Sequence, residues 1–118
     1  MMKEKFIRTK LPVRFMESIY KIIWSDEALK NLKEIINYLE NNWTEKELKQ
    51  FAKQLDKRLN SIERNPYLFQ KINPSTNLRR SVLSKQTSIF YQIVDTNVRL
   101  ITLFDNRQNP EQLTRKLA

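Results

Sequence analysis

The stretch SIFYQIVDTNVRLITLFDNRQNP, Ser88 to Pro110, contains two apolar runs joined by the polar turn 95–97. Such runs predict two β-strands, 88–94 and 98–104, paired as a hairpin. Residues 78–83 have the same character and precede the hairpin across the short link 84–87. We therefore expect three consecutive strands in an antiparallel meander.

The first half of the chain predicts one further strand and two helices. Ile19–Trp24 is rich in Ile and aromatic residues, which favours a short strand. Ser25 is a good N-cap, and apolar residues recur behind it at helical spacing to about residue 42. Thr44 and Glu47 form a capping-box motif for a second helix, which Pro66 ends. The link between the helices is short, so we expect an antiparallel helical hairpin with paired apolar stripes.

These elements predict an α+β fold in which an antiparallel sheet of about four strands packs on the N-terminal helical hairpin. Asn109 followed by Pro110 is typical of a helix start, so we expect a short C-terminal helix over 111–117. Residues 1–15 are basic and lack a clear period, and we interpret them as a mobile extension of one domain, residues 16–118. Met16 would serve equally well as a natural start.

Composition narrows the classes of function. The chain has 118 residues with a formal net charge of +9, which favours polyanions, an acidic protein or an anionic surface as the partner. It has no Cys and no His, so we expect no disulfide, no metal site, no cofactor and no imidazole chemistry. No apolar run has the length of a membrane span or resembles a signal peptide, and we expect a cytoplasmic protein. Glycine is also absent, so we expect Asn to take its place where φ is positive, with the turn Asp95-Thr96-Asn97 as the clearest case.

The strands carry more apolar side chains than one helical layer can bury. Apolar residues in 88–94 and 98–104 occupy both alternating sets of positions, which point to opposite faces of a sheet. Leftover apolar surface commonly marks a binding site, and basic residues border it here. The residues that we place on this partner-binding surface are Arg79, Phe90, Val94, Ile101 and Leu103.

Several segments, in this order and at these distances, resemble the RelE/ParE superfamily of toxins from bacterial toxin–antitoxin pairs. The segments are IYKIIWSDEALKNLKEIINYLE, NPYLF, LRRSVL, IFYQIVDTNVRLITLF and RQNP, which together cover about Ile19 to Pro110. The resemblance implies a small antiparallel sheet against a helical hairpin. It also implies neutralisation by a co-encoded acidic antitoxin whose tail wraps over the toxin, with a homodimer or a hetero-oligomer as the assembly.

The superfamily has two main activities. RelE-like members cleave messenger RNA on the ribosome without metal, whereas ParE-like members poison DNA gyrase. If this chain were such a ribonuclease, Lys85 or Tyr91 would transfer protons while Arg79, Arg80 and Arg107 held phosphate.

Departures from the pattern of the cleaving members favour a ParE-like toxin. Those members carry a basic residue at the end of the strand before the central hairpin, where this chain has Leu83. They also carry a Tyr or His near the C-terminus, and nothing after Phe104 is aromatic or His. Tyr91 shares its face with Ile89 and Ile93, which favours a packing role over proton transfer. A third hypothesis is a non-toxic member that only binds its partner.

Overall fold

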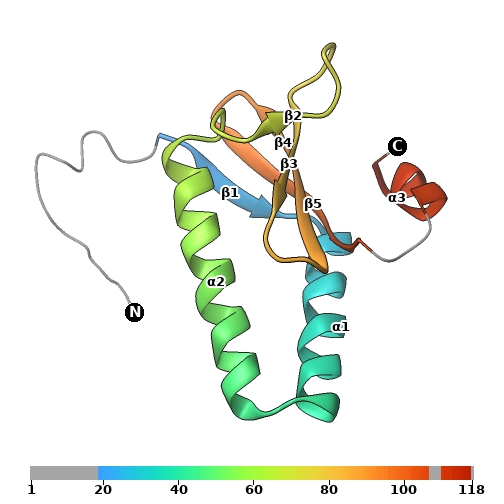
Figure 1. The fold of residues 1–118 in the computed structure, drawn as a ribbon. Helices are drawn as coiled ribbons and strands as arrows, with labels where there is room; N and C mark the ends of the chain where they lie inside the picture. The colour runs from blue at the N-terminus through green and yellow to red at the C-terminus, as the bar shows by residue number, and fades with distance from the viewer. Residues whose placement is uncertain (1–18, 107–109, 118) are drawn as a thin grey trace, which may run out of the picture.

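The computed structural model describes residues 19–106 and 110–117, and it confirms the α+β fold (Figure 1). The predicted extension 1–15 and the candidate Arg107 lie outside the described residues. The elements are, in order, β1 (Lys21–Trp24), α1 (Asp26–Asn42), α2 (Glu45–Arg64), β2 (Gln70–Lys71), β3 (Leu78–Val82), β4 (Thr87–Val94), β5 (Asn97–Asp105) and α3 (Pro110–Leu117).

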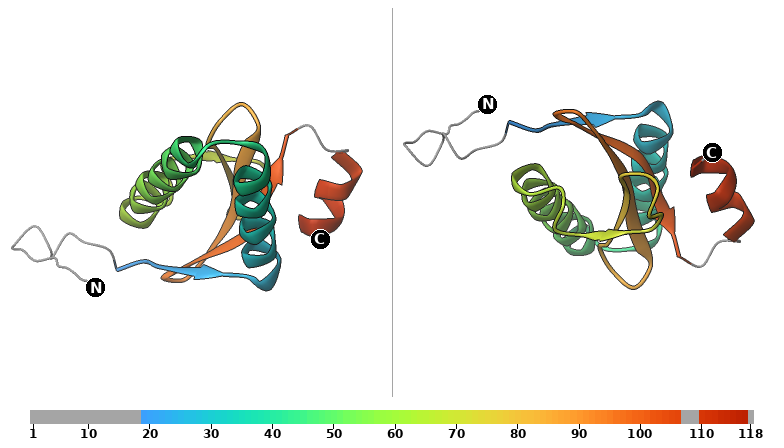
Figure 2. Two further views of the ribbon diagram at one scale, coloured as in Figure 1. Left: turned by 90° about the horizontal axis from the view of Figure 1, so that it is seen from below. Right: turned by 90° about the horizontal axis from the view of Figure 1, so that it is seen from above.

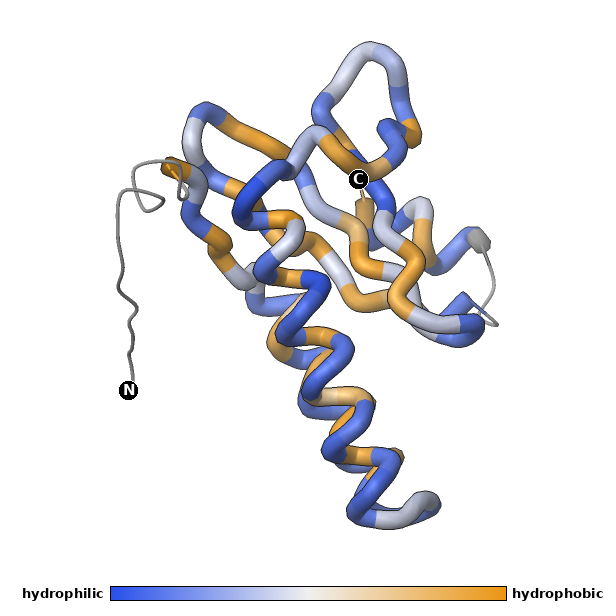
Figure 3. The backbone as a smooth tube through the Cα atoms, turned by 60° about the vertical axis from the view of Figure 1, so that its left-hand side comes forward, coloured by the Kyte–Doolittle hydropathy of each residue, from blue (hydrophilic) through white to orange (hydrophobic). Residues whose placement is uncertain are grey.

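The two long helices begin and end where the sequence predicts. The Ser25 hydroxyl accepts a hydrogen bond from the backbone N–H of Ala28 at 3.0 Å, which caps α1. Thr44 and Glu47 form the predicted capping box at the start of α2, and α2 ends two residues before Pro66. Figure 3 shows hydrophobic positions recurring along the helical hairpin, as expected for elements that bury one side.

The sheet has five strands in the order β1-β5-β4-β3-β2. The four predicted strands are confirmed, and the sheet differs from the expected antiparallel one in two respects. The two-residue strand β2 pairs with β3 and is too short to leave an alternating pattern in the sequence. β1 pairs with β5 in the parallel direction, so the sheet is mixed. No turn joins these two strands, and β1 adds to the edge where Ile22 and Trp24 extend the apolar face opposite Val98 and Leu100.

A β-bulge in β5 decides which side chains enter the core. Phe90 pairs with Thr102 and Tyr91 pairs with Leu100, so Ile101 has no partner on β4. The extra residue shifts the alternation by one, which turns Leu103 toward the helices with Val98 and Leu100. Leu103 is 3% exposed, so the expectation that it belongs to an open surface is wrong.

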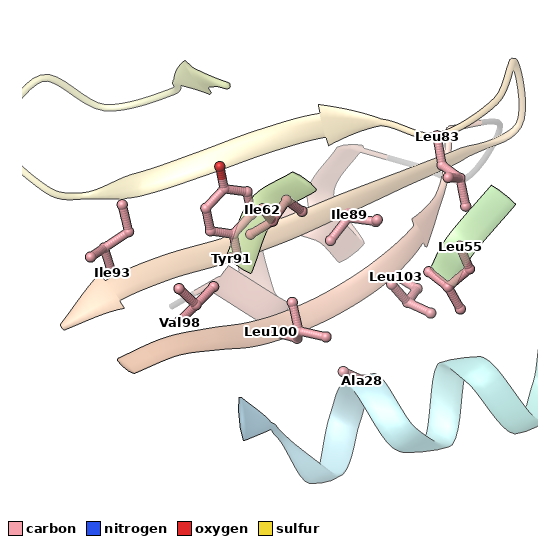
Figure 4. Close-up of a cluster of buried hydrophobic side chains, with 10 residues drawn as sticks. All are labelled: Ala28, Leu55, Ile62, Leu83, Ile89, Tyr91, Ile93, Val98, Leu100 and Leu103. Carbon is pink, nitrogen blue, oxygen red and sulfur yellow. The ribbon is translucent and has the colours of Figure 1, made fainter. Parts of the chain in front are cut away.

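The core lies between the sheet and the two long helices. Figure 4 shows Ile89, Tyr91 and Ile93 of β4 pointing into it together with Leu55 and Ile62 of α2. We call this the inner face of the sheet and the opposite side the outer face. One expectation about the helices is wrong. Their apolar stripes do not pack against each other along the whole hairpin. Both helices extend beyond the strands (Figure 1), and a cavity lies between them there.

A buried asparagine holds the bulge against α1. The side-chain oxygen of Asn31 accepts a hydrogen bond from the Thr102 hydroxyl at 2.5 Å and one from the backbone N–H of Leu103 at 3.1 Å. Its amide nitrogen donates to Glu27 at 2.8 Å, and Glu27 forms a 3.1 Å ion pair with Lys116 of α3. The hydrogen bond from Asn31 is the main cause that lowers the pKa of Glu27. One polar chain therefore connects α3, α1 and the bulge.

Replacing Asn31 with Ala should lower the free energy of unfolding by about 2 to 4 kcal/mol, because the buried Thr102 hydroxyl and Leu103 N–H lose their acceptor. Urea denaturation followed by circular dichroism measures the change. Asn37→Ala is the control, since Asn37 is exposed on the same helix. Equal losses in the two variants would contradict the role given to Asn31.

Candidate functional site

The sheet separates the residues that the sequence singles out. Arg79 pairs with Tyr91 and Arg80 pairs with Phe90, so the first pair lies on the inner face and the second on the outer face. Lys85 is exposed in the turn between β3 and β4. The predicted proton donor Tyr91 and the predicted phosphate ligand Arg80 therefore do not share a site.

Tyr91 is a packing residue. Its side chain is 0% exposed, and its hydroxyl donates a hydrogen bond to the carbonyl of Pro66 at 2.6 Å. Burial raises the pKa of Tyr91 to about 12, while the charge of Arg79 opposes that rise. A phenol that is buried, bonded to a carbonyl and hard to ionise is a poor proton-transfer group near neutral pH.

Arg79 is buried beside Tyr91 and belongs to the same packing. Its guanidinium donates to the carbonyl of Phe69 at 2.8 Å and to that of Tyr67 at 3.3 Å, and it lies 5.0 Å from the centre of the Tyr67 ring. Its Nε has no acceptor among the described residues. The expectation that Arg79 lies on an open surface is therefore wrong. The side chain secures the loop between α2 and β2 instead.

Arg80 is held in place on the outer face by two side chains that sequence reasoning missed. Its Nε donates to the Ser88 hydroxyl at 3.1 Å and its Nη2 contacts the Asn106 side-chain oxygen at 3.4 Å. Ser88 donates to the same oxygen at 2.7 Å, and the Asn106 amide donates to the carbonyl of Lys85 at 3.2 Å. This cluster joins β3, β4 and the end of β5. The only sequence signal for it is an Asn directly after the last strand.

The guanidinium of Arg80 is exposed and forms no ion pair with another described residue. An ordered, uncompensated guanidinium suits a carboxylate or a phosphate, which it binds through two parallel hydrogen bonds. The cluster therefore has the chemistry of an anion-binding surface. It contains no acid or base that titrates near neutral pH.

Phe90 is buried within the outer face. It packs edge to face on Phe104, with ring centres 6.3 Å apart, and Arg80 lies 5.7 Å from its centre. Lys116 of α3 lies 5.8 Å from the centre of Phe104. Phe90 is 2% exposed, so the expectation that it is open to a partner is wrong. α3, which lies beside β5 (Figure 2), and Arg80 cover this part of the sheet.

The remainder of the outer face is open and mixes apolar with basic residues. Val82 is 52% exposed, Val94 and Ile23 are also exposed, and Ile101 at the bulge is half-buried. Two of the five residues predicted for a partner-binding surface, Val94 and Ile101, are therefore accessible. Three cations border these apolar residues, and no strand residue on this face is acidic. The cations are Lys21, Arg80 and Arg99.

Two further features bear on function. Within residues 19–106 and 110–117, no group of three or more His, Cys, Asp or Glu side chains gathers as a metal site would require. In the same ranges, no helix is both long and apolar enough to span a membrane.

Residues 22–110 match the family model of the ParE toxin of the type II toxin–antitoxin system parDE. This chain belongs to the ParE toxin family. The match covers most of the chain and confirms the resemblance to the RelE/ParE superfamily. No curated protein matches the sequence of this ParE-family chain.

Solved structures of toxins share the fold of this ParE-family chain. The chromosomal ParDE system of P. aeruginosa superposes with a TM-score of 0.61 at 9% identity, over 74% of this chain and 96% of that one. The YoeB dimer of Staphylococcus aureus gives 0.51 at 19% identity, over 72% and 94%. The E. coli DinJ–YafQ toxin–antitoxin complex gives 0.52 at 11% identity, over 73% and 91%. At these identities the likeness establishes the fold alone.

Replacing Tyr91 with Phe should make the ParE-family chain less sensitive to alkali. The raised folded-state pKa means that the contribution of Tyr91 to stability is fully present below about pH 10, its unfolded pKa, and is lost as the pH rises through the folded value. Between pH 8 and pH 11 the wild type should lose about 1 to 1.5 kcal/mol more stability than the variant, because pH 11 lies one unit above the unfolded pKa and below the folded one.

Urea denaturation at pH 8 and pH 11 measures the effect, with Tyr38→Phe as the control because Tyr38 is half exposed. The control should lose as much unfolding free energy as the wild type between pH 8 and pH 11. If Tyr91→Phe also loses as much, Tyr91 is not the buried phenol described above.

Proposed function

We propose that this ParE-family chain arrests growth by poisoning DNA gyrase and that a co-encoded acidic antitoxin neutralises it. The family assignment supports a toxin of a type II toxin–antitoxin system. The observation that favours gyrase over messenger RNA is the placement of Tyr91 and Arg80 on opposite faces of the sheet. A protein that acts by binding requires an ordered surface, not an assembled acid–base pair.

Metal-free cleavage of RNA makes stronger demands than the described residues meet. It needs groups that activate the 2′-hydroxyl, stabilise the phosphorane and protonate the leaving oxygen, all around one phosphate. Tyr91 is buried on the opposite face from Arg80, and the hydrogen bond that joins Lys85 to the Arg80 cluster comes from its backbone carbonyl. A ribosome-dependent ribonuclease would then rest on the Lys85 side chain and on Arg107.

The outer face has the character that an acidic antitoxin segment requires. This face offers apolar contacts at Val82, Val94 and Ile101. Beside them lie Arg80 and Arg99, and the strands carry no acidic residue on this face. A partner segment that carries apolar residues next to carboxylates would bury these apolar side chains and neutralise these arginines. The YafQ and YoeB structures with the same fold are recorded in complexes, DinJ–YafQ and YoeB–YefM. We infer a comparable complex for this chain.

The purified chain, mixed with DNA gyrase, ATP and supercoiled plasmid, should cause linear DNA to accumulate after the protein is denatured and digested. The same chain should leave messenger RNA intact in a reconstituted translation reaction, and Tyr91→Phe should keep the gyrase effect. Cleaved messenger RNA without linear plasmid would support the ribonuclease. Neither effect, together with normal growth on induction, would identify a member that only binds.

Replacing Arg80 with Glu should weaken binding of the antitoxin from the adjacent reading frame by about 10 to 100-fold, because a charge-assisted hydrogen bond is replaced by repulsion. Isothermal titration calorimetry measures the dissociation constant. Lys53→Glu is the matched control, since Lys53 is exposed on α2, away from the sheet. If both variants bind like the wild type, the antitoxin does not use the Arg80 cluster.

A further inference from the structure

The far part of the helical hairpin encloses a second concave surface, which we call the hairpin groove. It is an open cavity of about 530 Å³ between α1 and α2, and the β3–β4 turn, the end of β5 and Lys116 of α3 also line it. It forms where the helices extend beyond the strands (Figure 1), so the sheet does not fill the space between their apolar stripes. Its apolar and aromatic lining from the hairpin consists of Ile35, Tyr38, Leu39, Trp43 and Phe51.

Aromatic side chains of the hairpin groove remain accessible in the isolated chain. Tyr38 is 51% exposed and Trp43 is 48% exposed, while Ile35, Leu39 and Phe51 are half-buried. Trp43 lies between the helices in an extended conformation, with its N–H donating to the carbonyl of Leu39 at 2.9 Å. Exposed Trp and Tyr side chains often contribute most of the binding energy at protein interfaces, and an exposed apolar patch of this kind commonly marks an interaction site.

The charge of the hairpin groove is opposite to that of the rest of the molecule. Among the described residues, its lining includes the carboxylates of Glu34 and Glu47 and one cation, Lys116, which pairs with Glu27. The chain as a whole has a net charge of +9, and the outer face has basic borders. An acidic segment suited to the outer face is therefore unsuited to this groove.

We propose that the hairpin groove binds an amphipathic helix of a partner protein, one that carries Lys or Arg beside its apolar residues. A helix fits because the groove walls are the side chains of α1 and α2, whose backbone groups are already paired within each helix, so a strand would find no edge to join. Apolar residues spaced three and four apart would contact Tyr38, Trp43 and Phe51. Basic residues on the flanks would face Glu34 and Glu47.

Two synthetic helical peptides of equal length test the chemistry of the partner. Both carry the same apolar residues at i, i+3, i+4 and i+7, and the flanking positions are Lys and Arg in one peptide and Glu in the other. Calorimetry with the full chain should show at least about tenfold tighter binding of the basic peptide. The preference should shrink as the salt concentration rises, because exposed charges are screened. Equal binding, or tighter binding of the acidic peptide, would overturn the proposal.

Surface variants locate the binding. Tyr38→Ala should raise the dissociation constant of the basic peptide at least about fivefold. Glu34→Lys should reverse the preference between the two peptides. The controls are Glu40→Lys, on the opposite side of α1, and Val82→Ala, on the outer face of the sheet, both of which should bind like the wild type. If Glu34→Lys behaves like Glu40→Lys, the proposed electrostatic preference is wrong.

A second copy of the chain is the rival occupant. Sedimentation of the chain alone should show a monomer at the concentrations used for calorimetry. A dimer that Tyr38→Ala dissociates would overturn the proposal, because the groove would then bind another copy. These measurements use neither gyrase nor antitoxin, so a failure here leaves the proposed function in place. A failure of the gyrase assay likewise leaves the groove result intact.

Discussion

The hydrogen bonds between Asn31 and the bulge in β5 are the constraint on which the two faces of the sheet depend. Because Ile101 has no partner on β4, the residues after it exchange faces, and Asn31 fixes that exchange by binding Thr102 and the backbone of Leu103. Leu103 completes the inner core and Phe104 moves to the outer face beside Phe90. The inserted residue therefore decides which face each residue of β5 after Ile101 occupies.

The two surfaces of the molecule differ in charge as well as in position. The outer face combines accessible valines with Arg80 and Arg99, whereas the hairpin groove combines aromatic residues with carboxylates. A chain with an excess of positive charge would be expected to repel basic partners everywhere. The carboxylates of the hairpin groove create a local exception, so the two surfaces suit partner segments of opposite charge.

Sequence patterns predicted the elements well because their determinants are local. Ser25, Thr44 and Pro66 mark helix ends by bonds and clashes within a few residues, and the absence of glycine was met by Asp95, which takes φ 56° in the β4–β5 turn. The bulge, the two-residue strand β2 and the parallel pairing of β1 depend on distant contacts and left no local signal. The burial of Phe90 and Leu103 followed from those contacts. The cluster of Ser88 and Asn106 around Arg80 could not be foreseen for the same reason.

The central claim is that the outer face, and not the interior around Tyr91, is where this ParE-family chain meets its antitoxin. Methyl NMR of the chain during titration with the antitoxin tests it most directly, because methyl groups report on each surface separately. The account predicts large shifts for Val82 and Val94 on the outer face and small ones for Ile62 and Ile89 in the core. Unchanged Val82 and Val94 signals at saturation would contradict it.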